Sequence, residues 1–171
     1  MQDIQKPVFE NIVQVGIVVK NIKETAQRFA DRFGIGPWYI KKYDSGDVYD
    51  MKLYSRRQDY SMILGFCFIG NIQIELIEPI DESIYLEFYK EHGEGLHHLK
   101  MKVESYEEQL KSLQEKDIKV VQSGGAHQGR RRYAYLDTKD DLGFITEIAE
   151  GSPDFERPEP DYWWPNLCNS S

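Results

Sequence analysis

The sequence predicts an α+β fold in which two tandem βαβββ modules form a curved, mostly antiparallel sheet around a cleft. The chain has 171 residues, which suits a single domain. A pattern of one strand, one capped helix and several further strands occurs twice. The two occurrences are offset by 84 positions, since Gln14 then falls on His98 and the N-cap candidate Asn21 falls on Ser105. A repeat of this length in two copies favours paired modules over a solenoid.

The first module is expected over about residues 10–80. Residues 11–19 are rich in β-branched side chains, which favour a strand. Asn21 is a suitable N-cap for a helix whose apolar residues recur at helical spacing as far as Phe33, and Gly34 is a typical stop signal. Half-buried strands are expected after it, over residues 38–43, 48–55, 61–69 and 72–78.

The second module, over about residues 95–150, repeats this order. A strand over residues 96–103 precedes Ser105, which forms a capping-box pattern with Glu108 at the start of a helix. Between the two modules, residues 82–92 are expected to be helical. The remaining strands of the second module are expected over residues 118–122, 131–136 and 143–150.

Residues 8–150 are therefore expected to form one domain, followed by an irregular tail over residues 151–171. The tail contains four of the seven prolines and two of the three tryptophans. Tyr162, Trp163 and Trp164 would be costly to leave in water. We therefore expect the tail to pack on the body of the protein or on a partner subunit.

The composition excludes several functional classes. Asp and Glu total 29 against 21 Lys and Arg, and the formal net charge of −8 argues against nucleic acid or an anionic membrane as partner. No apolar run approaches the ~20 residues that span a bilayer, and the first ten residues lack the apolar region of a signal peptide. Cys67 and Cys168 show neither metal nor disulfide spacing. A cytoplasmic location is the expectation.

Each module begins and ends with a strand that carries one polar side chain in an otherwise apolar stretch. These side chains are Gln14 and Glu75 in the first module, and His98 and Glu147 in the second. Side chains alternate between the two faces of a strand. The aliphatic face of each strand is expected to pack against the helices, so the four polar side chains should share the opposite face. By the same alternation, His97 should point away from His98 and into the packed side.

If the two modules curve toward each other, this shared face becomes a pocket. One imidazole, two carboxylates and one amide oxygen could then bind one divalent metal ion and leave coordination positions open. Open positions are what metal-assisted catalysis requires. The sequence leaves Zn, Ni, Co, Mn and Mg as candidates for the metal.

The sequence resembles the vicinal oxygen chelate superfamily, which includes glyoxalase I, methylmalonyl-CoA epimerase, extradiol dioxygenases and bleomycin-resistance proteins. The matching segments are VQVGIVVKNI, IQIELIEP, GEGLHHLKMKV and YLDTKDDLGFITEIAE, within about residues 10–150. Metal-dependent members take their ligands from the first and last strands of each module. The resemblance therefore implies a metal site of Gln14, Glu75, His98 and Glu147. Many members have histidine at the position of Gln14, but the present set resembles that of some glyoxalase I enzymes.

The resemblance implies an isomerase or lyase that moves a proton α to a carbonyl group through an enolate-like intermediate. The segment GEGLHHL is similar to the epimerase branch, and glyoxalase-like chemistry is the second possibility. Glu147 is the candidate base. A single well-placed histidine argues against an extradiol dioxygenase, whose iron site needs two. The alternative is a non-catalytic protein of the same fold that binds and sequesters a small molecule such as a drug.

Candidate substrate-binding residues lie in two segments. Arg131 and Arg132, in the segment SGGAHQGRRR, could bind an anionic group of a small-molecule substrate, or the segment could be a flexible hairpin loop. Trp38 and Tyr43 could line the pocket, or they could belong to the core or to an interface. The resemblance and the aromatic tail together favour a homodimer.

Overall fold

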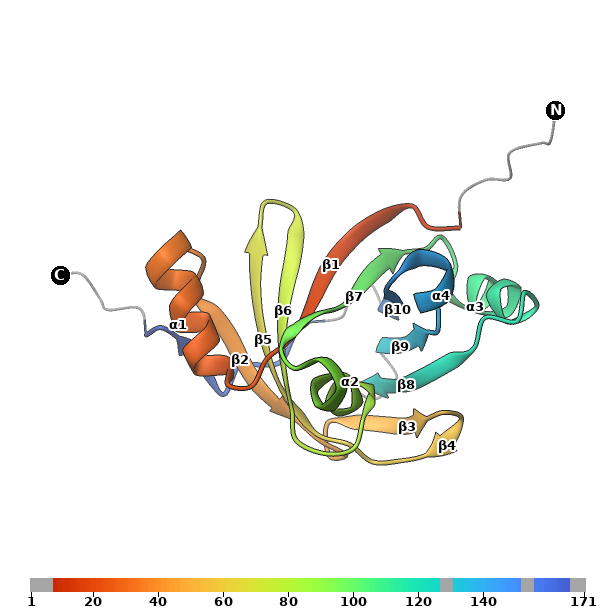
Figure 1. The fold of residues 1–171 in the computed structure, drawn as a ribbon, viewed down its shortest axis with the longest axis horizontal. Coiled ribbons are helices and arrows are strands. Elements are labelled where there is room, and N and C mark those ends of the chain that lie inside the picture. Colours follow the sequence, from red (N-terminus) through yellow and green to blue (C-terminus); the bar gives the residue numbers. More distant parts are fainter. Residues whose placement is uncertain (1–7, 127–130, 152–155, 167–171) are drawn as a thin grey trace.

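The structure is a computed structural model that describes residues 8–126, 131–151 and 156–166. Among these residues, eleven strands form one sheet in the order β11-β2-β5-β6-β1-β7-β10-β9-β8-β3-β4. The sheet is strongly curved, and its strands form an open arc that does not close on itself (Figure 1). Within the described part of the chain, only the pairs β1–β6 and β7–β10 are parallel. This is the predicted α+β architecture.

The N-terminal module contains β1 (Asn11–Val18), α1 (Ile22–Phe33), β2 (Trp38–Tyr43), β5 (Met62–Ile69) and β6 (Ile72–Pro79). The predicted signals bound its helix. The Asn21 side chain accepts a hydrogen bond from the Glu24 backbone N–H, and Gly34 takes the left-handed conformation with φ of 66°. Helix α1 packs on β5 and β6 through a buried apolar cluster. The aliphatic faces of β1 and β6 therefore point toward this helix, as predicted.

The C-terminal module contains β7 (Gly95–Lys102), α3 (Tyr106–Gln114), β8 (Val120–Ala126), β9 (Arg131–Leu136), α4 (Lys139–Leu142) and β10 (Ile145–Gly151). Ser105 caps α3, because its side chain accepts a hydrogen bond from the Glu108 backbone N–H. Strand β10 pairs with β7 as β6 pairs with β1, and the modules meet where β1 and β7 pair antiparallel. The predicted duplication thus appears as the same pairing pattern in both halves.

Two strands and one helix link the modules. Strands β3 (Val48–Leu53) and β4 (Arg56–Arg57) extend the C-terminal half of the sheet, because β3 pairs antiparallel with β8. Helix α2 (Ile84–His92) connects β6 to β7. Its Ile84 and Tyr85 belong to a buried cluster that includes Tyr43 of the first module and Tyr133 of the second. The connecting helix therefore packs on the inner side of the arc, opposite to α1 and α3.

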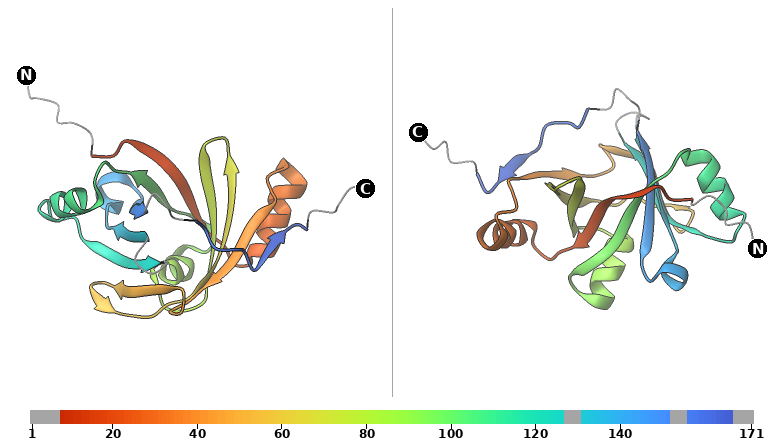
Figure 2. Two further views of the ribbon diagram at one scale, coloured as in Figure 1. Left: turned by 180° about the vertical axis from the view of Figure 1, so that it is seen from behind. Right: turned by 90° about the horizontal axis from the view of Figure 1, so that it is seen from above.

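The C-terminal segment differs from the irregular tail that the sequence predicts. Residues Tyr162–Trp164 form strand β11, which pairs antiparallel with β2 at one edge of the sheet. Tyr162 and Trp164 pack against the cluster under α1, and the Trp163 ring lies 5.9 Å from the Tyr39 ring between centroids. The segment runs alongside β2 (Figure 2). The aromatic residues thus pack on the body of the same chain.

None of the helices in the described ranges has the length and apolar character needed to cross a bilayer. Cys67 lies on β5 as a free thiol. Cys168 lies outside the described residues.

Candidate metal centre and ligand cavity

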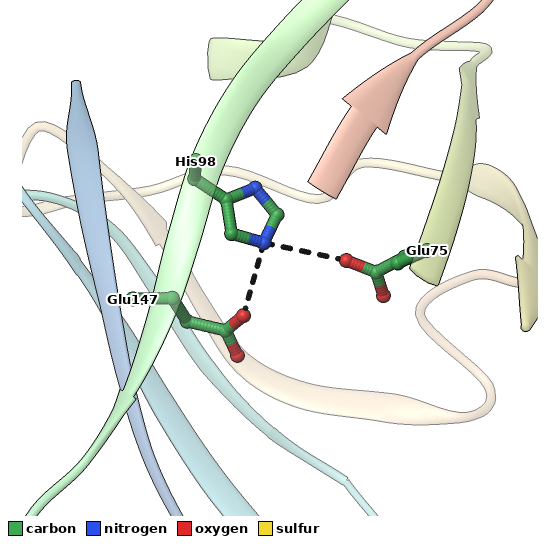
Figure 3. Close-up of side chains that lie close together, drawn as sticks. All are labelled: Glu75, His98 and Glu147. Carbon is green, nitrogen blue, oxygen red and sulfur yellow. Dashed lines mark ion pairs between the residues drawn. The ribbon is translucent and has the colours of Figure 1, made fainter. Parts of the chain in front are cut away.

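Three strands bring Glu75, His98 and Glu147 together. Glu75 lies on β6 and His98 on β7, and both pair with Gly16 of the intervening β1. Glu147 lies on β10, beside β7. The His98 Nε2 atom is 3.4 Å from Glu75 Oε2 and 3.2 Å from Glu147 Oε2 (Figure 3). Three of the four predicted ligands therefore converge.

The three facing atoms suit a metal ion. All three residues are buried: the exposed fraction of the surface is 0% for His98, 6% for Glu75 and 4% for Glu147. None of their facing atoms, His98 Nε2, Glu75 Oε2 and Glu147 Oε2, makes a hydrogen bond within the described structure, although buried polar atoms normally have a partner. The ligand atoms all lie within 4.8 Å of one another. One imidazole nitrogen with two carboxylate oxygens is a donor set that divalent transition metals accept.

Gly16 makes room for the imidazole. A side chain at this position would place its Cβ 2.0 Å from His98 Cε1 and 2.3 Å from His98 Nδ1. Glycine inside a strand often marks the close approach of another group. The predicted site did not include Gly16. Its position in a run of β-branched residues is the signal that could have identified it.

His97 does not take the predicted orientation. At this point β7 has one more residue than β1, so His97 forms a β-bulge. The bulge brings the two imidazoles together, and His97 Nδ1 lies 3.0 Å from His98 Nδ1. His97 also packs against Tyr85 and Phe88. Burial, together with the charge of His98, lowers the pKa of His97 well below its ordinary value. The simple alternation of faces is therefore wrong here, and His97 is a buried support for the His98 ring.

Gln14, the fourth predicted ligand, is buried on the predicted face of β1, with 2% of the residue exposed. Its amide donates a hydrogen bond to Gln73 Oε1 at 2.6 Å, and its Oε1 accepts one from Lys100 Nζ at 3.5 Å. These two partners lie two positions along the strands from Glu75 and His98. The Gln14 amide is thus engaged beside the group of three, and its role as a ligand stays a prediction.

Lys100 determines the charge balance of the site. Its Nζ lies 2.8 Å from Glu147 Oε1. Burial raises the pKa of the Glu147 carboxyl, but the Lys100 charge and the contact with His98 outweigh burial and lower this pKa to about 2. Burial lowers the pKa of His98, but the nearby carboxylates of Glu147 and Glu75 outweigh burial and raise this pKa above its ordinary value. The site therefore favours an ionised Glu147 beside cationic partners.

A cavity of about 70 Å³ opens beside the candidate ligands, with Glu75, Glu147 and Lys100 in its wall. This volume has room for several water molecules. Tyrosines form much of the remaining wall, and their hydroxyl groups are paired. Tyr85 donates a hydrogen bond to Tyr135 at 2.7 Å, and the hydroxyls of Tyr60 and Tyr133 lie 2.6 Å apart; of these four, Tyr85, Tyr133 and Tyr135 line the cavity. Burial raises the pKa of all four tyrosines, so they are neutral donors and acceptors.

Of the two predicted aromatic pocket residues, the cavity contains Tyr43 and not Trp38. Trp38 is fully buried in the cluster under α1, and its indole N–H donates a hydrogen bond to the Ile35 carbonyl at 3.0 Å. The two residues are five positions apart on β2, so they point to opposite faces. The expectation that Trp38 lines the pocket is corrected accordingly.

The same alternation separates the two predicted arginines. Arg131 lines the cavity. Arg132 follows it on β9 and points to the other face, where it forms ion pairs with Glu107 and Glu150. Arg132 is therefore not a cavity residue, contrary to the expectation from sequence. Arg130, in the same basic run, lies outside the described residues.

Two further cationic residues, Lys100 and Arg157, line the cavity and were not among the predicted site residues. Lys100 is two residues after His98 on β7, so the alternation of faces could have identified it. Arg157 belongs to the C-terminal segment, and no local sequence pattern connects it with the cavity.

The sequence of this chain matches the model of a known protein family. Residues 13–135 match the model of the Glyoxalase/Bleomycin resistance protein/Dioxygenase superfamily. The uncharacterized protein YqjC of Bacillus subtilis (strain 168) is 26% identical over 101 residues, which are 57% of this chain and 71% of that protein.

Solved structures share the fold. A hypothetical protein from Bacillus halodurans C-125 superposes with a TM-score of 0.61 and 24% sequence identity, over 86% of this chain and 98% of that chain. Methylmalonyl-CoA epimerase from Mycobacterium tuberculosis superposes with a TM-score of 0.62 and 17% identity, over 89% of this chain and 95% of that chain. At these identities the likeness establishes the curved sheet architecture.

Proposed function

The chain belongs to the glyoxalase/bleomycin resistance protein/dioxygenase superfamily, and we propose that it is a metal-dependent isomerase or lyase. The proposed reaction moves a proton α to a carbonyl group through an enolate-like intermediate. One observation carries the proposal: three buried ligand atoms, without hydrogen-bond partners among the described residues, converge beside a cavity. The fold shared with methylmalonyl-CoA epimerase supports an epimerase-like reaction on an acyl-CoA. A glyoxalase-like reaction on a thiol hemiacetal is the second form of the proposal.

The proposed metal ligands are Glu75, His98 and Glu147, and Gln14 adds a fourth if its amide turns away from Gln73. A bound divalent ion would supply a Lewis acid for the substrate carbonyl. Zn, Ni, Co, Mn and Mg are the candidates. Metal analysis of protein purified without chelators and without a histidine tag tests this step, and a stoichiometric divalent metal is the expected result.

Glu147 is the proposed base. The contact of its Oε1 with Lys100 helps to keep its pKa low, which makes it a weak base before substrate arrives. A substrate oxygen that gains negative charge can accept a hydrogen bond from Lys100 instead. Glu147 would then lose a cationic partner, and once its carboxylate also loosens from the ion, its pKa would rise and it could accept the proton. The Lys100 ammonium would meanwhile stabilise the negative charge on the enolate oxygen.

Exchange of the substrate α-hydrogen with solvent deuterium tests this chemistry. The protein is incubated in heavy water with methylmalonyl-CoA and, separately, with the hemithioacetal of methylglyoxal, and mass spectrometry follows the exchange. General-base catalysis contributes ~10²–10⁴-fold, so Glu147→Gln should slow exchange by about that factor. Glutamine keeps an oxygen for the metal but cannot take the proton.

Glu150→Gln is the matched control. Glu150 lies three residues along β10 and pairs with Arg132 on the outer face, so its loss should leave exchange unchanged. Metal content is measured in both variants. Exchange at the parent rate by metal-loaded Glu147→Gln would exclude Glu147 as the base.

The aromatic wall of the cavity favours a second function, the non-catalytic binding of a small molecule such as a drug. This function needs no metal and no proton transfer. A parent protein that binds a ligand tightly, contains no metal and exchanges no α-hydrogen would support it over the enzyme.

A homodimer and a cytoplasmic location complete the proposal. Phe68, Ile69 and Trp163 are exposed, with 62%, 48% and 45% of each residue accessible, and a second copy could cover such surface. Light scattering should give the mass of a dimer. A monomer at high micromolar concentration would remove the dimer from the proposal.

A further inference from the structure

The C-terminal segment, residues 156–166, is attached to β2 at several points. The Asp161 backbone N–H donates a hydrogen bond to the Ile40 carbonyl at 2.9 Å, and Asp161 Oδ2 accepts one from the Lys42 backbone N–H at 2.8 Å. Closer to the cavity, the Tyr39 hydroxyl donates to the Pro158 carbonyl at 2.7 Å. Together with the pairing of β11, these bonds hold the segment against the sheet edge (Figure 2). The backbone next to residue 157 is therefore held against β2.

From this position, the Arg157 side chain lines the cavity. Its guanidinium lies 3.8 Å from the centroid of the Phe66 ring and 5.2 Å from that of Tyr39. Phe66 and Arg157 both line the cavity. Within the described part of the chain, Arg157 makes no ion pair with a carboxylate, and the rings hold it by cation–π contact. A guanidinium held flat on a ring keeps its edge N–H groups available for a ligand.

Arg131 approaches the same cavity from β9, on the other half of the sheet. Burial lowers the pKa of Arg157, and the positive charge of Arg131 lowers it further, because the two guanidinium groups feel each other across the cavity. Lys100 is balanced by Glu147 at 2.8 Å. Arg131 and Arg157 thus bring two guanidinium groups to the wall of the cavity, which among the described residues also contains Glu75.

We propose that residues 156–166 complete the ligand cavity, and that Arg157 and Arg131 together bind an oxyanion group of the ligand, a carboxylate or a phosphate. The planar guanidinium forks suit such oxygens. The proposal rests on the cavity of the proposed function and names the chemical class of its ligand. It requires neither a bound metal nor turnover, so it can be tested separately.

Titration calorimetry on metal-free protein measures the binding of malonate and of inorganic phosphate, with malonamide as the uncharged counterpart of malonate. Malonate, phosphate or both should bind the parent at least about tenfold more tightly than malonamide, because charge-assisted hydrogen bonds to arginine contribute a tenfold difference or more. The stronger of the two anions identifies the preferred group. Arg157→Gln and Arg131→Gln should each weaken that binding by about tenfold or more.

Arg57→Gln is the control for charge alone, since Arg57 lies on β4 in an exposed pair with Asp59. It should bind the anions like the parent. Arg157→Lys keeps the charge but not the planar fork, so it should lose less affinity than Arg157→Gln. If Arg157→Gln unfolds, the lysine variant and Arg131→Gln still decide the outcome.

Equal binding of malonamide and both anions by the parent would overturn the proposal, and so would anion binding that is unchanged in Arg157→Gln and Arg157→Lys. The outcome is independent of the proposed enzyme activity. Anion binding without α-hydrogen exchange would remove the proposed function and keep the anion site. Exchange of the α-hydrogen without arginine-dependent anion binding would remove the anion site and keep the proposed function.

Discussion

Gly16→Ala tests the geometry of the candidate metal centre, because it adds one methyl group beside His98 and substitutes none of the candidate ligands. The new Cβ would lie 2.0 Å from His98 Cε1. Carbon atoms in contact are about 3.5 Å apart or more, so the ring would have to move by about 1.5 Å. His98 is fully buried, and its ring lies 5.0 Å from that of Tyr135 between centroids. The movement would therefore displace packed neighbours.

A shift of this size would also separate the imidazole from the two carboxylates. Metal sites hold their ligand distances within ~0.2 Å. We therefore expect Gly16→Ala to weaken metal binding by at least the roughly 10–100-fold that is typical of lost support for a ligand. Overpacking of a core costs ~1–3 kcal/mol, which in a domain of this size lowers Tm by roughly 2–12 °C.

Titration calorimetry with Zn or Mn and thermal unfolding of the metal-free protein provide the two measurements. Gly46→Ala is the control, because its Cβ would meet only the end of the Asp44 side chain, at 3.1 Å, in an exposed turn. It should change neither quantity. If Gly16→Ala also kept the parent affinity and Tm, the imidazole could not lie over Gly16, and the reasoning would be refuted.

Two further predictions concern the histidines and pH. His98→Ala should weaken metal binding more than any other single change, whereas His97→Ala should weaken it by only about 10–100-fold, since His97 acts through its 3.0 Å contact with His98; calorimetry that gave the reverse order would contradict the ligand assignment. In the metal-free protein, Glu147 should lose its stabilising contribution as pH falls from 4.5 toward 2, and His98 should lose its contribution as pH rises above 6.5, whereas buried His97, whose pKa is lowered, should cost stability as pH falls below 6.5. Urea unfolding between about pH 2 and pH 5 should show Glu147→Gln with a weaker acid dependence than the parent, and an unchanged dependence would exclude Glu147 as its source.

Elements with local signals were predictable from the sequence. Helix α1 begins after Asn21 and ends at Gly34 because capping and the left-handed conformation depend on those residues themselves. Strand β11 and the pairing of β3 with β8 were not predictable in this way. Both depend on contacts between segments that are distant in the sequence, and prolines around β11 made the tail look irregular.

The candidate site shows the same division. Alternation along regular strands placed Glu75, His98 and Glu147 on one face because the side-chain period of a strand is two residues. It failed at His97, since a β-bulge depends on the register of the neighbouring strand. Trp38 and Tyr43 are five positions apart on β2, so the alternation of faces already predicts that they point to opposite sides of the sheet. To predict which residues share a site, the face of the strand on which each side chain lies is therefore more informative than the residue type alone.

In the metal-free protein, the positive charge of Lys100 should stabilise the buried carboxylate of Glu147. Lys100 and His98 are the cations beside Glu147, at 2.8 Å and 3.2 Å. Breaking a buried pair costs about 3–5 kcal/mol, because it leaves a charge uncompensated. Lys100→Met keeps an unbranched side chain and removes only the ammonium. The metal-free variant should therefore have a lower Tm than the parent.

A divalent ion would restore the missing positive charge, so the rise in Tm on adding metal should be larger in Lys100→Met than in the parent. Lys102→Met removes the same charge two residues along β7, from a pair with Glu10 at 2.8 Å in which 60% of the lysine side chain is exposed. Such exposed pairs are screened by water and contribute little to stability, so this control should match the parent with and without metal. Thermal unfolding of the three proteins gives the comparison. An equal metal-induced rise in all three would mean that Lys100 and the metal do not share Glu147, and the charge balance inferred for the site would be wrong.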